Sequence, residues 1–91
     1  GLRIVREEVG FVKASKIRRQ ILETLDKPMT PTELSQTLKI PDYKLPAISR
    51  ALRELEDKKI VVCLNPKQKK GRLYQRSSDG NSVLELLRKQ S

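Results

Sequence analysis

Apolar residues recur at intervals of three and four along much of the chain, the spacing that places them on one face of an α-helix. One helix is predicted from the N-cap residue Ser15 to Leu25, before a stop at residues 26–28, which include a proline. A shorter helix follows the sequence Thr30-Pro31-Thr32-Glu33, in which threonine and glutamate form a capping box and proline takes the first helical position.

The strongest amphipathic pattern predicts a third helix over about residues 44–58. It begins between Asp42 and Pro46, because proline is tolerated only in the first turn of a helix. Arg50 lies opposite its apolar stripe. That stripe consists of Leu45, Ile48, Leu52 and Leu55. One face of this helix therefore packs against the protein, and the other is free to recognise a partner.

A β-hairpin is predicted next. Strand-forming residues begin at Ile60 and continue in residues 72–76, and a polar, glycine-containing loop over about 65–72 joins them. The sequence Ser77-Ser78-Asp79-Gly80 is expected to break the chain.

Two amphipathic segments flank these elements. Residues 81–90 predict a final helix, and residues 1–14 predict a short, imperfect one, with an extended strand as the alternative. Both carry apolar residues suited to pairing across a two-fold axis, so we expect a homodimer. These residues are Leu2, Ile4, Val5 and Val9 near the start, and Val83, Leu84, Leu86 and Leu87 near the end.

The order of elements predicts an α+β fold, the winged helix-turn-helix. It comprises a three-helix core, a β-hairpin wing, and flanking N- and C-terminal helices. Residues 15–76 form the expected DNA-binding domain, and residues 1–14 and 81–90 are candidate dimerisation segments.

Length and charge narrow the class of partner. Ninety-one residues provide one small core and no room for a large enclosed active site. The net charge of +9 attracts polyanions, so nucleic acid is the first candidate partner and an anionic membrane surface the second.

Several classes of function are not expected. The longest apolar run, residues 60–64, is too short to span a membrane, and no signal-peptide pattern opens the sequence, which predicts a soluble, cytoplasmic protein without membrane contact. One cysteine and no histidine argue against a disulfide framework and a metal site. Cys63 is expected to be a small buried hydrophobe. No catalytic set or cofactor motif is present, so neither an enzyme nor a cofactor is predicted.

The third helix carries the candidate base-reading residues. Arg50 can pair bidentately with guanine, and Pro46 and Ala47 beside it can touch a thymine methyl group. A solvated arginine or a phosphate contact is the alternative for Arg50. Residues at the rim of this face are more suited to phosphate contacts; they are Tyr43, Lys44, Ser49 and Arg53.

Phosphate contacts are also predicted from the wing and from the second helix. The wing hairpin is expected to carry five positive charges: Lys67, Lys69, Lys70, Arg72 and Arg76. A solvated charged face is the alternative for these residues. Thr30 and Thr32 begin a helix whose free N–H groups suit phosphate, although capping is their simpler role. Lys16, Arg18 and Arg19 are expected on the solvated surface.

The chain resembles the winged helix-turn-helix regulators of the ArsR and MarR type, especially the small archaeal members, over roughly residues 10–87. The matching segments are residues 15–25, 30–34, 45–56, 60–61 and 71–74. The resemblance implies dimeric, sequence-selective binding to double-stranded DNA in transcriptional control. With one cysteine and no histidine, the chain lacks the ligands of the metal-sensing ArsR branch. Its short terminal segments do not predict a small-molecule effector site.

Two other functions remain open at this stage. A non-specific chromatin or architectural protein would use the same charge, but would have less need of a shaped helix holding Arg50. A winged-helix subunit that contacts other proteins would carry the charge incidentally.

Overall fold

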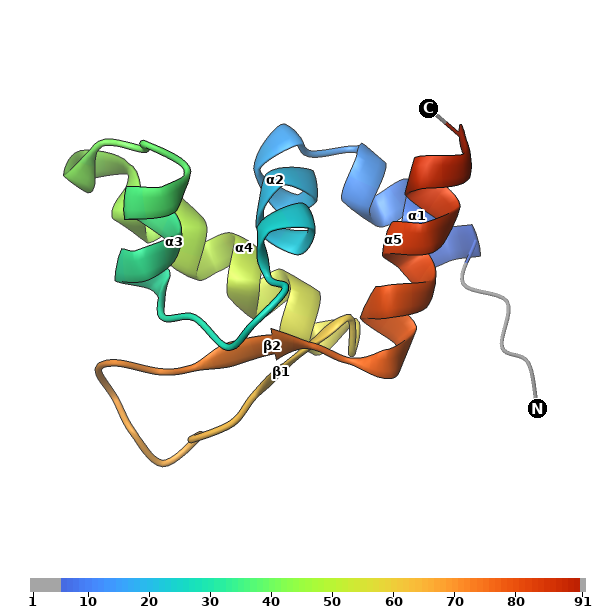
Figure 1. The fold of residues 1–91 in the computed structure, drawn as a ribbon. Helices are drawn as coiled ribbons and strands as arrows, with labels where there is room; N and C mark the ends of the chain where they lie inside the picture. The colour runs from blue at the N-terminus through green and yellow to red at the C-terminus, as the bar shows by residue number, and fades with distance from the viewer. Residues whose placement is uncertain (1–5, 91) are drawn as a thin grey trace.

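The computed structural model describes residues 6–90, and within them the helices lie on one side of a small hairpin (Figure 1). The order of elements is α1 (Arg6–Lys13), α2 (Lys16–Thr24), α3 (Pro31–Thr37), the 3₁₀ turn η1 (Asp42–Lys44), α4 (Leu45–Asp57), β1 (Val61–Cys63), β2 (Tyr74–Arg76) and α5 (Ser78–Gln90). This order confirms the predicted α+β winged helix. The prediction for residues 1–5 lies outside the described residues.

Side-chain caps fix the starts of α2 and α3. The hydroxyl oxygen of Ser15 accepts a hydrogen bond from the backbone N–H of Arg18 at 3.3 Å. At α3 the capping box is complete: Thr30 Oγ1 accepts from the N–H of Glu33, and Glu33 Oε1 accepts from the N–H of Thr30, each at 3.1 Å. Both predicted helix starts are confirmed, because each cap satisfies donors that the first turn leaves free.

α4 follows the 3₁₀ turn η1 without a break, so its start falls inside the predicted interval. Pro46 occupies its first turn. The buried residues of the helix are Ile48, Ala51, Leu52 and Leu55. Leu45 is half-buried, and Arg50 is exposed on the opposite face.

The sheet includes a contact that the sequence analysis missed. β1 and β2 pair antiparallel, with Val62 opposite Gln75. On the other side of β2, Met29 forms a bridge with Tyr74 through two backbone hydrogen bonds of 2.9 and 3.0 Å. The segment before α3, for which the sequence predicted only the end of the preceding helix, is therefore attached to the hairpin.

α5 begins at Ser78, three residues earlier than predicted, and the expected break at residues 77–80 is wrong. Ser77 caps the helix, since its hydroxyl accepts from the N–H of Gly80 at 3.0 Å. Gly80 was interpreted as a helix breaker. In the structure Gly80 is buried inside the helix, and glycine is needed there because a side chain would collide with the Ile60 carbonyl.

The core is aliphatic and continuous from α1 to the hairpin. α1 and α5 pack together at one end of the molecule, α3 and the start of α4 lie at the other, and α2 lies between them (Figure 1). Val83, Leu84 and Leu87 of α5 are buried within the single chain, and Leu86 is half-buried against the same core. These side chains therefore do not form the free apolar face that the sequence analysis expected for pairing across a two-fold axis. The remaining members of the core include Val9, Val12, Ile21, Leu22, Leu25, Met29, Leu34, Ile60, Val61 and Tyr74.

Candidate nucleic-acid interface

An open groove of about 430 Å³ lies where the start of α3, one side of α4 and the wing meet. We define the wing as the loop of residues 64–73 between β1 and β2, and call this hollow the wing groove. Its lining residues are Thr30, Pro31, Thr32, Leu45, Ser49, Arg53, Lys69, Lys70, Gly71, Arg72 and Tyr74. The groove contains four positively charged residues and no acidic one, so it suits an anionic ligand.

The structure brings many of the predicted contact residues to this groove. From three separate elements come Thr30, Thr32, Ser49, Arg53, Lys69, Lys70 and Arg72. Leu45 and Tyr74 also line the groove but were not among the predicted contact residues. In the sequence, Leu45 is part of the apolar stripe of the third predicted helix, and Tyr74 is part of a predicted strand. Only the tertiary fold shows that both residues lie at this groove.

The remaining predicted residues lie outside the groove lining, and all but Lys67 lie on the outward side of α4 or in the η1 turn before it. Pro46, Ala47 and Arg50 are exposed on α4. Tyr43, in η1, is 78% exposed, and Lys44 Nζ lies 6.0 Å from the centre of its ring. Lys67 is exposed on the wing. α4 therefore presents two adjoining strips, one facing the wing groove and one facing solvent.

Asn65 organises the wing, a role that the sequence analysis missed. Its Oδ1 accepts from the N–H of Leu73 at 2.7 Å and from the Cys63 thiol at 3.6 Å, while its Nδ2 donates to the Gly71 carbonyl at 3.1 Å. Gly71 has φ +66°, a conformation that favours glycine. Cys63 is half-buried, so the expectation of a buried hydrophobe holds only in part. The available signal was an asparagine directly after the apolar run of residues 60–64.

Arg72 lies partly inside the wing, unlike the exposed lysines around it. Its Nη2 donates to the Pro66 carbonyl at 3.3 Å, across the loop. Tyr74 lies near it and is only 5% exposed. Burial raises the pKa of the Tyr74 phenol, and the positive charge of Arg72 opposes part of that rise. The pKa of Arg72 is itself raised, chiefly by Tyr74, so the guanidinium stays charged.

Arg76 does not belong to the wing, although the sequence analysis counted it with the wing charges. Its Nη1 donates to the Leu22 carbonyl at 2.6 Å, and its Nε donates to Asn81 Oδ1 at 3.0 Å. Burial lowers its pKa. The side chain joins β2 to α2 and α5, because the last residue of β2 lies beneath both helices.

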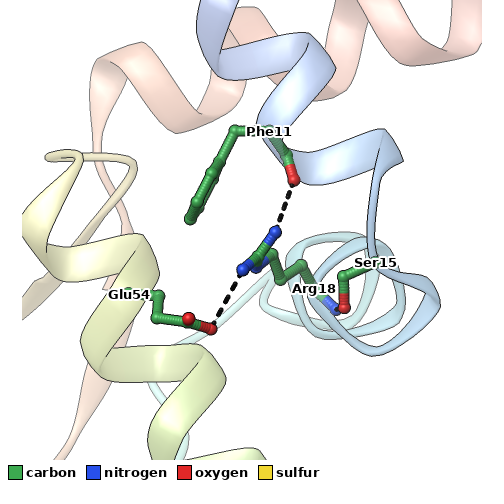
Figure 2. A network of polar contacts seen from close by, with 4 residues as sticks. All are labelled: Phe11, Ser15, Arg18 and Glu54. Atoms are coloured by element: carbon green, nitrogen blue, oxygen red, sulfur yellow. Dashed lines mark hydrogen bonds and ion pairs between the residues drawn. The ribbon is translucent and has the colours of Figure 1, made fainter.

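Arg18 is also not the solvated residue that was expected (Figure 2). Its Nη1 donates to the Phe11 carbonyl at 3.0 Å, and its guanidinium carbon lies 3.9 Å from the centre of the Phe11 ring. Its Nη2 lies 3.2 Å from Glu54 Oε1. Arg18 therefore connects α1, α2 and α4. The sequence showed the residues, but not that three helices converge on them.

Residues 6–90 were also searched for other kinds of site. They contain no helix long and apolar enough to cross a membrane. In the same range no group of three or more histidine, cysteine, aspartate or glutamate residues is arranged to hold a metal ion.

Comparisons with known proteins agree with this architecture. A family model described as a helix-turn-helix domain matches residues 14–63. Among solved structures, wild-type MarR from E. coli in its apo form is similar, with a TM-score of 0.57 and 24% sequence identity, covering 98% of this chain and 77% of that chain. None of the curated proteins matches. The predicted resemblance to winged helix-turn-helix proteins is confirmed.

Proposed function

The chain belongs to the helix-turn-helix domain family of DNA-binding transcriptional regulators, and we propose that it reads double-stranded DNA sequence-selectively. The family is not enzymatic, which confirms the expectation that the chain is not an enzyme. In the proposed complex the N-terminal half of α4 enters the major groove, and the wing contacts phosphate or the minor groove.

The wing groove is the observation that carries this proposal. Arg53, Lys69, Lys70 and Arg72 line one hollow beside the exposed face of α4. A duplex that receives α4 in its major groove presents phosphates on both sides of the helix. The groove supports a phosphate position on the wing side, next to Thr30 and Thr32.

Base reading is assigned to the outward strip of α4. Arg50 is exposed and makes no ion pair within residues 6–90, so its guanidinium can offer both donors to guanine O6 and N7. Pro46 and Ala47 lie beside it near the start of the helix, where small side chains permit close approach to the base edges. Tyr43 and Lys44 extend this surface and suit phosphate contacts.

The experiment is selection of bound sequences from a random duplex library at about 150 mM salt, the regime in which specific and non-specific binding separate. We expect enrichment of one motif that binds at least about 10³-fold more tightly than random duplex. The Arg50→Lys variant should relax the preference at one position. Equal affinity for every duplex would support the non-specific alternative, and no binding at low salt would contradict the proposal.

We further infer that the binding unit is a homodimer formed through α1 and α5. These helices pack together at the end away from α3, so a two-fold axis there leaves both α4 helices free (Figure 1). The selected motif would then be pseudo-palindromic, with half-sites about 34 Å apart. Sedimentation equilibrium at tens of micromolar should show twice the 10.5 kDa chain mass, and a single 10.5 kDa species would contradict the dimer.

A further inference from the structure

Glu54 lies one helical turn after Arg50 on α4. Residues four apart on a helix are neighbours on its surface, and opposite charges at that spacing attract each other. An ion pair between them would occupy the guanidinium assigned to base reading, and DNA would have to break that pair in order to bind. The availability of Arg50 therefore depends on where the Glu54 carboxylate lies.

The same spacing forms an ion pair elsewhere in this chain. On α2, Arg19 precedes Glu23 by four residues, and Arg19 Nε lies 3.7 Å from Glu23 Oε1. Both side chains are about half exposed, at 50% and 53%. On α2, therefore, an arginine followed four residues later by a glutamate forms an ion pair on the protein surface.

On α4 the carboxylate is held by a different arginine. Arg18 Nη2 lies 3.2 Å from Glu54 Oε1, and the Arg18 side chain is only 18% exposed (Figure 2). The Phe11 carbonyl and ring fix that guanidinium from the α1 side. Because Arg18 is already ordered by these contacts, holding Glu54 costs it little further side-chain entropy.

We propose that Arg18 is a positioning residue that holds the Glu54 carboxylate and so keeps the Arg50 guanidinium available to DNA. This inference rests on the proposed function. Lys58 is a second cation at helical spacing, four residues after Glu54, and its Nζ lies 5.5 Å from the centre of the Phe11 ring. When Arg18 is removed, Glu54 is shared between Arg50 and Lys58.

The test compares Arg18→Met with Arg19→Met, which removes the same charge from the next position of α2. Both variants should bind the selected duplex more weakly, because each loses one positive charge. Arg18→Met should lose about twofold more per binding site, the effect of one helical ion pair. Adding Glu54→Gln to Arg18→Met should recover both the affinity lost with the charge and the extra twofold loss. Adding Glu23→Gln to Arg19→Met should recover only the affinity lost with the charge. In an Arg50→Met background the difference between the two arginine variants should vanish.

A second variant leaves the Arg18 contacts to Phe11 in place and guards against loss of folding. Glu54→Gln in the otherwise unchanged protein should alter DNA affinity no more than Glu23→Gln, because Arg18 already removes Glu54 from competition. A larger gain for Glu54→Gln would overturn the proposal. Equal losses for Arg18→Met and Arg19→Met would overturn it as well, and thermal unfolding of each variant identifies losses that come from instability.

A measurement without DNA separates this inference from the proposed function. The side-chain Nε–Hε signal of Arg50 in NMR spectra of the free protein reports whether its guanidinium is paired. Arg18→Met should shift that signal, and the added Glu54→Gln should return it toward its original position. If the signal responds but the protein binds no duplex, the proposed function fails and the Arg18 mechanism stands. An unchanged signal would refute the mechanism.

Discussion

Gly80 shows how one residue sets the contact between α5 and the hairpin. A Cβ atom built on it would collide with the Ile60 carbonyl oxygen, a backbone atom that cannot rotate away. Ser77 also hydrogen bonds to that carbonyl, through its N–H at 3.0 Å and its hydroxyl at 2.9 Å. The start of α5 is therefore fixed against the chain between α4 and β1.

Gly80→Ala should destabilise the protein. Relieving the collision requires α5 to move away from the hairpin, and overpacking of this kind costs about 1–3 kcal/mol. Gly10→Ala is the matched control, since nothing lies within 4 Å of its Cβ position and alanine favours a helix by roughly 0.8–1 kcal/mol over glycine. Urea denaturation should show a lower midpoint for the first variant and a higher one for the second; a Gly80→Ala midpoint equal to that of the original chain would contradict the close approach.

Tyr74 gives the protein a predictable response to alkaline pH. Burial raises the pKa of its phenol in the folded state, so the unfolded chain releases this proton at lower pH than the folded protein. The stabilisation is fully present below the unfolded pKa, near 10, and is lost as pH rises toward the folded value.

Tyr74→Phe should therefore change stability little at pH 7 and flatten its decline above about pH 10. Chemical denaturation at several pH values would measure this difference. The same substitution at Tyr43, which is 78% exposed, controls for the loss of one tyrosine. A Tyr74→Phe variant that declines as steeply as the original protein would contradict the assigned cause.

At the scale of elements, the wing depends on one side chain for its shape. Asn65→Ala removes the acceptor of the Leu73 N–H and the donor to the Gly71 carbonyl. We expect amide exchange of Leu73 to accelerate and DNA affinity to fall several-fold, with a smaller effect on thermal unfolding than a core substitution would have. Gln68→Ala, at an exposed wing position, is the control. If Asn65→Ala and Gln68→Ala exchange at the same rate, the loop does not depend on Asn65.

Local signals in the sequence were enough to predict α2, α3 and α4 and the caps of α2 and α3. Ser15 and the capping box at Thr30 act within three residues, so their effects can be inferred without the fold. The start of α5 could not be inferred in this way, because glycine breaks or fits a helix according to what lies against it. The bridge between Met29 and Tyr74 likewise depends on residues far apart in the chain.

In the candidate site, too, the features set by local sequence were predicted, and those set by residues far apart in the chain were not. The exposed face of α4 follows from helical periodicity, and Arg50 lies on it as predicted. Arg18 and Arg76 could not be separated from surface cations by sequence, since a charged residue becomes internal only when carbonyl or carboxylate groups converge on it. Phe11 and Leu22 provide those carbonyl groups here.

At the scale of the whole molecule, the +9 charge is unevenly placed with respect to the proposed duplex. The wing offers exposed lysines, whereas the second half of α4 carries Glu56 and Asp57, beyond the Glu54 that Arg18 holds. The duplex should therefore approach the wing and the start of α4 together and stay clear of the end of that helix. Counterion release from phosphates gives this arrangement a measurable consequence.

The triple substitution Lys67→Gln, Lys69→Gln and Lys70→Gln should lower the slope of log affinity against log salt concentration by up to about 2.7 per half-site, since each phosphate neutralised contributes about 0.9. The control replaces three exposed lysines away from the wing groove, Lys27, Lys59 and Lys89, and changes net charge equally. Fluorescence anisotropy titrations between 50 and 300 mM salt, about the range in which such slopes are measured, would compare the two. If both triple substitutions reduce the slope equally, the lysines act through the overall charge of the protein and the wing has no special phosphate contact. A reduction confined to the wing triple places phosphates at the wing, because only charges in contact with the duplex displace its bound counterions.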